Sequence, residues 1–132
     1  MVGARDIRSE KGQTAVEFAL VAPLIVVLLL GVVQVGIAFN NYLTLTDAAR
    51  AGARKAIVAR FAGATSADIQ QYVADAASGL DTSKLQVTVT NPTWNAPGSD
   101  VTVTAKYPYS IDLLGWVVAS GNLTSTMTDR IE

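Results

Sequence analysis

The sequence predicts an α+β fold, in which a long N-terminal transmembrane helix continues into a small head with a second helix and a three-stranded antiparallel sheet. Three observations lead to this prediction. The run Phe18–Phe39 carries no charged residue, residues 47–62 are rich in alanine, and the spacing of apolar residues changes to two from Leu85 onwards. A period of about 3.6 residues is typical of helices and a period of two is typical of strands.

The composition excludes several classes of function. The chain of 132 residues is short enough for one head on one long helix, and its net charge of −1 implies no general attraction to nucleic acid. It has no cysteine and no histidine, which excludes disulfides, zinc–thiolate sites and Ser-His-Asp catalysis. We therefore expect a protein that is not an enzyme and that uses no cofactor or metal.

The apolar run Phe18–Phe39 is long enough to cross a membrane. A helix of its 22 residues spans about 33 Å, which matches a hydrocarbon layer about 30 Å thick. A secretory signal peptide is the alternative, with Gly36-Ile37-Ala38 as its cleavage site, but its apolar core should hold only about 7–15 residues. The length of the run favours a single membrane span.

The leader Met1–Gly12 is polar, and we expect it to lack regular structure. Basic residues beside a span tend to remain in the cytoplasm. Three basic residues precede the span and three follow it, namely Arg5, Arg8, Lys11, Arg50, Arg54 and Lys55. Charge alone therefore does not fix the orientation of the span.

The junction between leader and span reads KGQTAVEF at residues 11–18, and ALVAP follows it. A second stretch reads DAARAGAR at residues 47–54. Together they resemble the TadE-like pseudopilins, or minor pilins, of tight-adherence (Tad/Flp) type IV pilus systems. Precursors of that kind carry a short basic leader that ends in glycine, a glutamate five places on, and then phenylalanine. The resemblance covers residues 9–59 and departs at Gln34, where relatives often carry an acidic residue.

The resemblance implies a maturation step and a mode of assembly. A prepilin peptidase in the membrane would recognise Glu17 and Phe18 and cut after Gly12, leaving a new α-amino group on Gln13. That amine would pair with Glu17 of a neighbouring pilin or pseudopilin subunit, so that N-terminal helices pack into a homo- or hetero-oligomer. The resemblance also implies a cytoplasmic N-terminus and a head outside the bacterial cytoplasmic membrane, or at the cell surface after assembly.

A plainer interpretation of Glu17 stays open. The helix dipole favours a carboxylate near the start of a helix, at the level of the lipid headgroups, without any further partner. The chain would then be a single-pass anchor for a binding domain that never enters a filament. A mature chain that begins at Gln13 would distinguish the pilin-like structural subunit from such an anchor.

We expect one helix over residues 13–62, first transmembrane and then amphipathic. Pro23 removes one helical hydrogen bond inside the span, which predicts either a mild kink or a softening that lets helices repack. Farther along, Ala49, Gly52 and Ala56 fall on one face at spacings of three and four, and their small side chains permit close packing of another helix or of a sheet. A basic face beside them contacts either water or anionic headgroups.

The extracytoplasmic head is expected over residues 63–132. Thr65 or Ser66 caps its helix, and Gly79 stops the chain in a left-handed conformation. The head thus begins with a helix that can lie against the long one.

Alternation of apolar and polar residues predicts three strands after this helix. They fall at residues 85–90, 101–107 and 123–131, the first two paired as an antiparallel hairpin. Residues 111–119 are interpreted as a short helix or as a loop on the core or the membrane surface, followed by a turn at residues 121–122.

Two tryptophans lie outside these strands. We interpret Trp94 and Trp116 as rings that close the edges of a thin core, with a partner contact or a membrane anchor as the alternative.

Overall fold

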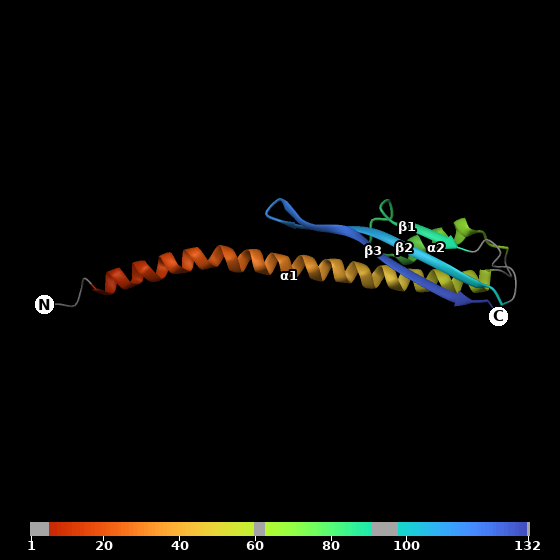
Figure 1. The fold of residues 1–132 in the computed structure, drawn as a ribbon, viewed down its shortest axis with the longest axis horizontal. Helices are drawn as coiled ribbons and strands as arrows, with labels where there is room; N and C mark the ends of the chain where they lie inside the picture. Colours follow the sequence, from red (N-terminus) through yellow and green to blue (C-terminus); the bar gives the residue numbers. More distant parts are fainter. Residues whose placement is uncertain (1–5, 60–62, 91–97, 132) are drawn as a thin grey trace.

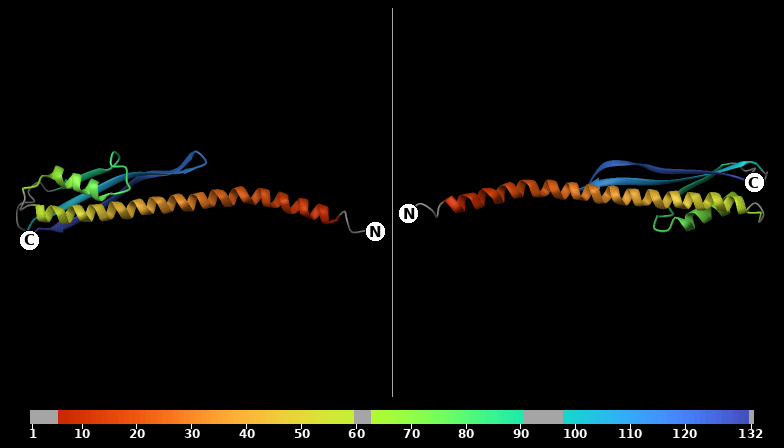
Figure 2. Two further views of the ribbon diagram at one scale, coloured as in Figure 1. Left: turned by 180° about the vertical axis from the view of Figure 1, so that it is seen from behind. Right: turned by 90° about the horizontal axis from the view of Figure 1, so that it is seen from below.

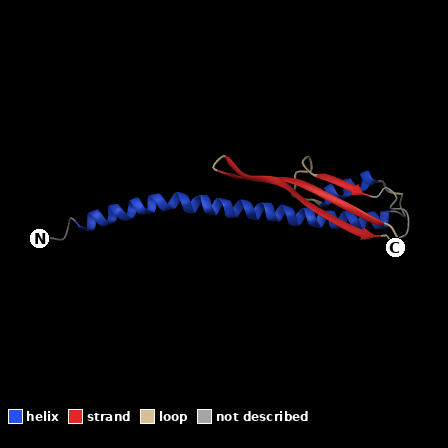
Figure 3. Ribbon diagram, viewed as in Figure 1, coloured by secondary structure: helices blue, strands red, loops and turns tan. Residues whose placement is uncertain are grey.

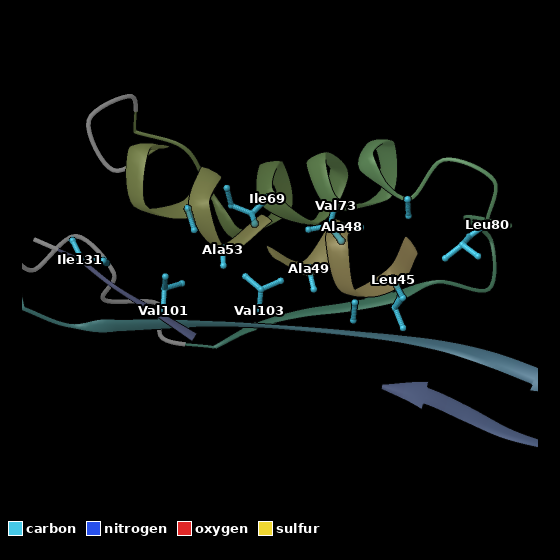
Figure 4. Close-up of a cluster of buried hydrophobic side chains, with 13 residues drawn as sticks. Leu45, Ala48, Ala49, Ala53, Ile69, Val73, Leu80, Val101, Val103 and Ile131 are labelled. Atoms are coloured by element: carbon cyan, nitrogen blue, oxygen red, sulfur yellow. The ribbon is translucent and has the colours of Figure 1, made fainter. Parts of the chain in front are cut away.

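The computed structural model describes residues 6–59, 63–90 and 98–131 and confirms the α+β fold. The elements in chain order are α1 (Asp6–Ala59), α2 (Ser66–Ala76), β1 (Gln86–Thr90), β2 (Asp100–Leu113) and β3 (Trp116–Arg130). The three strands form one antiparallel sheet in the order β1-β2-β3 (Figure 3). Both helices pack on the same face of this sheet (Figure 4).

α1 is the axis of the molecule. Its 54 residues correspond to a rod about 80 Å long. The C-terminal half lies along the head, whereas the N-terminal half, which contains Pro23, extends alone and is gently curved (Figures 1 and 2). A proline that removes a helical hydrogen bond accounts for such curvature.

α1 begins within the leader, so the prediction that the whole leader lacks regular structure is wrong. The helix starts at Asp6 and runs through Gly12 without a break. The residues between them include good helix formers and no proline, and extending an existing helix costs far less than nucleating a new one.

α2 starts at a capping box. The Asp68 N–H donates to the Thr65 hydroxyl at 3.4 Å, and the Thr65 N–H donates to the Asp68 carboxylate at 2.7 Å. Thr65, rather than Ser66, is therefore the N-cap. These donors, the Thr65 N–H first and then its hydroxyl, hold the pKa of Asp68 below its usual value of 3.8. Beyond the helix, Gly79 has the expected positive φ, at 94°.

The sheet follows the predicted alternation. Val103 of β2 pairs with Val89 of β1 on one side and with Met127 of β3 on the other. On the other face, the hydroxyls of Thr102 and Thr128 lie 2.9 Å apart. The predicted β1–β2 hairpin is confirmed, while its loop, including Trp94, lies at residues 91–97 outside the described part of the chain.

β2 and β3 form a much longer hairpin than predicted. Residues 111–119, expected as a helix or loop, belong to the two strands and to the tight turn Leu114-Gly115, whose φ angles are 53° and 87°. The turn expected at residues 121–122 is wrong, because Gly121 lies inside β3 opposite Tyr109. A Cβ at Gly121 would come within 3.1 Å of the Tyr109 ring, so the glycine gives room for an aromatic ring on the neighbouring strand.

The core lies where α1, α2 and the sheet meet (Figure 4). α1 contributes mainly small buried side chains, whereas α2 and β2 contribute branched ones. The labelled core residues are Leu45, Ala48, Ala49, Ala53, Ile69, Val73, Leu80, Val101, Val103 and Ile131. Small residues on α1 bring its backbone close to both partners, and closest at Gly52, where a Cβ would collide with Val73 Cγ2.

We predict that Gly52→Ala destabilises the head. The added methyl overpacks the contact with Val73, which costs about 1–3 kcal/mol and outweighs the gain of about 0.5–1 kcal/mol in helix propensity. Thermal unfolding of the full chain in detergent, followed by circular dichroism, should show a midpoint lowered by several degrees. Gly36→Ala is the matched control, because a Cβ at Gly36 meets nothing within 4 Å. A midpoint for Gly52→Ala at or above that of Gly36→Ala would contradict the prediction.

We predict that the capping box loses its charge contribution in acid. The folded pKa of Asp68 lies below its ordinary value of 3.8. The stabilisation is therefore complete when the pH is well above 3.8, and it is lost as the pH falls through the folded pKa. Asp68→Asn should therefore lower the unfolding midpoint near neutral pH, and the difference from the unmodified chain should shrink on acidification. Asp75→Asn, at the other end of α2, controls for the loss of one charge. A difference for Asp68→Asn that stays constant with pH would count against this account.

Candidate functional site at the start of the apolar helix

The N-terminal half of α1 exposes an almost continuous apolar surface. An 18-residue window has a mean hydropathy of 2.8 and none of it is buried, so this helix is long and apolar enough to cross a membrane. Leu24, for example, is 75% exposed. A soluble monomer rarely leaves so much apolar surface in water. The helix is compatible with a single-pass anchor, although an N-terminal signal sequence passes the same test of length and composition.

The predicted processing and recognition residues share one exposed stretch of α1. Gly12 is exposed, and a Cβ there would meet nothing within 4 Å. The side-chain amide of the next residue, Gln13, donates to Glu17 Oε1, one turn farther along the helix, at 3.1 Å. Phe18 follows with 71% of its surface exposed. The arrangement leaves the Gly12–Gln13 bond and the Glu17 carboxylate on the surface, within about 8 Å of each other along the helix axis.

The four residues predicted to pack helices divide into two groups. Ala49, Gly52 and Ala56 are buried against the head of the same chain. Pro23 is exposed on the N-terminal half of α1. The first three therefore hold the head to α1, and a role for Pro23 between subunits stays a prediction.

One contact between α1 and the sheet was not predicted from the sequence. The Asp112 N–H donates to Gln34 Oε1 at 2.6 Å, and the Gln34 amide donates back to the Asp112 carbonyl. Gln34 thus ties the β2–β3 hairpin to the apolar part of α1. A lone polar residue in an apolar run predicts a polar partner, but it does not say which residue, 78 positions away, supplies it.

Comparison with known proteins supports the interpretation of the junction between leader and apolar run. Residues 12–54 match the family model described as TadE-like protein. This part of the chain is TadE-like. The match includes the junction and the stretch at residues 47–54, and it confirms the resemblance drawn from the sequence. No curated protein and no solved structure matches the chain.

A TadE-like segment is compatible with a pilin-like protein that associates with Tad pili, with the membrane and with other pilins. The match ends at residue 54, so the C-terminal turn of α1, α2 and the sheet lie beyond it. Among the residues that the structure describes, no three acidic side chains gather where they could hold a metal ion.

The basic residues Arg50, Arg54 and Lys55 of α1 lie far from the apolar run. Arg50 forms an exposed ion pair with Asp47 at 3.9 Å, and the Lys55 ammonium lies 5.4 Å from the centre of the Tyr72 ring. Arg50 follows the last residue of the apolar run, Phe39, by 11 positions, or about 16 Å of helix. This distance places the basic face in water when α1 stands along the membrane normal.

Proposed function

We propose that this protein is a pilin-like structural subunit, a minor pilin or pseudopilin of a Tad/Flp pilus, which a prepilin peptidase cuts after Gly12. The observation that carries the proposal is the exposed carboxylate of Glu17 at the start of an unburied apolar helix, inside the TadE-like match. The protein acts through assembly, without catalysis of its own.

Cleavage after Gly12 fits the local physics of α1. A peptidase binds its substrate in an extended form, so the helix must open at the cut. Glycine weakens a helix by about 0.5–1 kcal/mol relative to alanine, and its lack of a side chain lets other backbones approach. Gly12 is thus a point where α1 opens at low cost.

Cleavage also changes the electrostatics of the helix start. The new α-amino group of Gln13 is a cation about 6 Å from Glu17 along the helix axis. An unpaired charge in the hydrocarbon costs at least about 2.5–3.5 kcal/mol. Within one chain the Gln13 side chain already occupies Glu17 Oε1. Pairing of the amine with Glu17 of an adjacent subunit lowers the cost for both chains and sets the axial register of their helices.

We infer that the leader stays in the cytoplasm, where the peptidase acts, and that the head lies outside the bacterial cytoplasmic membrane. Subunits leave the bilayer together when their N-terminal helices pack in the pilus. A single-pass anchor that never enters a filament is the alternative, and it predicts an uncut Met1.

We predict that the mature protein begins at Gln13. N-terminal sequencing of chains from membranes and from sheared surface fibres should give Gln13 in both. Gly12→Val should retain the leader, because a β-branched side chain hinders the extended approach of the peptidase. Gly3→Val, in the same leader, should be cut normally. Mature chains that keep Met1 would refute the cleavage step.

We predict that Glu17→Gln is cleaved but excluded from fibres. The amide cannot neutralise the new amine of a neighbour, so the contact that sets the register is lost. Gly12 and Phe18 remain for the peptidase, so cleavage continues. Immunoblots of sheared fibres should show a loss of at least about tenfold, the equivalent of 1.4 kcal/mol. Glu10→Gln removes the same charge from the discarded leader and should assemble normally. Fibres with normal amounts of Glu17→Gln would overturn the pairing but leave the cleavage untouched.

A further inference from the structure

We propose that the tip of the β2–β3 hairpin inserts into the lipid bilayer beside α1, in the leaflet at the C-terminal end of the apolar run. The tip is the segment Leu113–Val118. This contact rests on the membrane span of the proposed function and adds a second lipid-binding element to it, contributed by the head.

The tip exposes large apolar side chains. Trp116 is 81% exposed, Leu114 75%, and Val117 and Val118 63% each. Between Asp112 and Asp129 the sequence has no charged residue. Tryptophan is enriched where membrane and water meet, because its ring is apolar and its N–H is polar. The composition of the tip therefore suits the lipid interface.

The depth of the tip is set by its attachment to α1. The two hydrogen bonds between Gln34 and the backbone of Asp112 hold the hairpin five positions before Phe39, about 7.5 Å inside the end of the apolar run. Figures 1 and 2 show the hairpin running beside α1, past the rest of the head and toward the N-terminal half. A bilayer that surrounds this part of α1 also surrounds the tip.

Polar residues mark how far the tip can enter. Ser110 donates a hydrogen bond from its hydroxyl to the Asp112 carboxylate at 3.2 Å. A carboxylate is expensive in hydrocarbon, so Asp112 opposes any entry deeper than its bonds to Gln34 set, while Leu114 and Trp116 lie beyond it. The insertion is therefore confined to one leaflet.

The backbone of the tip is suited to a medium with little water. The strands remain paired up to Leu113 and Trp116, which leaves a turn of only two residues. At Asp112, the outward N–H and carbonyl are bonded to Gln34. A register shift next to Asp112 makes a bulge, which brings Val117 and Val118 to the surface together. Because lipid cannot supply hydrogen bonds, these features lower the cost of insertion.

A bilayer explains the surface better than a protein partner does. The tip is fixed at membrane depth by contacts within one chain, and a subunit meets lipid there before it meets any other subunit. A neighbouring copy that covered the tip would have to displace that lipid, and the experiment below separates the two occupants.

The test uses full-length chains with one tryptophan, reconstituted in vesicles of phosphatidylethanolamine and phosphatidylglycerol. Trp94→Phe leaves Trp116 as the reporter of the tip. Val27→Trp, in a chain with both natural tryptophans replaced by Phe, reports the span. Thr88→Trp in the same background reports β1, where Thr88 is exposed. Lipids brominated near the headgroup or near the middle of the acyl chain act as quenchers, and iodide probes contact with water.

We expect the emission of Trp116 to shift to the blue and to be quenched by both kinds of brominated lipid, which fits a depth between the headgroups and residue 27. Emission from the Val27→Trp chain should be quenched most by deep bromines, and emission from the Thr88→Trp chain only by iodide. If Trp116 is quenched only by iodide, or is shielded from both iodide and lipid by a second copy, the insertion is overturned while a quenched reporter in the span leaves the anchor intact. If the reporter at position 27 also escapes the bromines, the span and the insertion are both overturned.

A second variant tests the attachment itself. Gln34→Leu removes the bonds to Asp112 and makes the span more apolar, so α1 stays inserted. We expect the quenching of Trp116 by brominated lipid to fall, while that of a reporter at position 27 is unchanged. Asn40→Leu, an exposed polar-to-apolar change on the same helix, controls for added apolarity. Equal quenching of Trp116 in both variants would show that Gln34 does not position the tip.

Discussion

A single continuous helix has to fit two different surroundings, and this requirement shapes the rest of the chain. The N-terminal half of α1 carries large apolar side chains that the head leaves exposed. Their burial contributes to stability only when lipid or another apolar surface removes them from water. The C-terminal half carries alanine and glycine, so that α2 and the sheet can approach its backbone closely. Gly52 against Val73 is the tightest of these approaches. Exchanging the two kinds of residue would weaken the anchor and push the head away.

The elements of the head could be predicted where local chemistry decides them. Thr65 and Asp68 form a cap within one turn, and the valines of β1 and β2 alternate with threonines. The long hairpin could not be predicted in this way. Its turn, Leu114-Gly115, lacks the asparagine or aspartate that usually marks a tight turn, and the apolar residues around it do not alternate. Gly121 indicated a turn, because glycine is common in turns. Its role in the structure is to leave space for the ring of Tyr109, which lies on the neighbouring strand and is not evident from the local sequence.

The candidate site shows the same division. The cluster from Gly12 to Phe18 could be recognised because its residues are consecutive, and the family match includes it. The bonds from Gln34 to Asp112 join residues 78 positions apart, and only the folded chain brings them together. Trp116 was expected to close the edge of the core, but it is 81% exposed at the end of the hairpin. Its environment depends on the length of β2 and β3, which the sequence did not reveal.

The unbroken course of α1 has a mechanical consequence. Glu17 and Gly52 belong to one helix, so a rod of roughly 50 Å joins the junction to the middle of the head. When two such rods slide past each other, their heads shift by the same amount. In a fibre, the axial distance between neighbouring heads therefore equals the axial offset between their N-terminal helices.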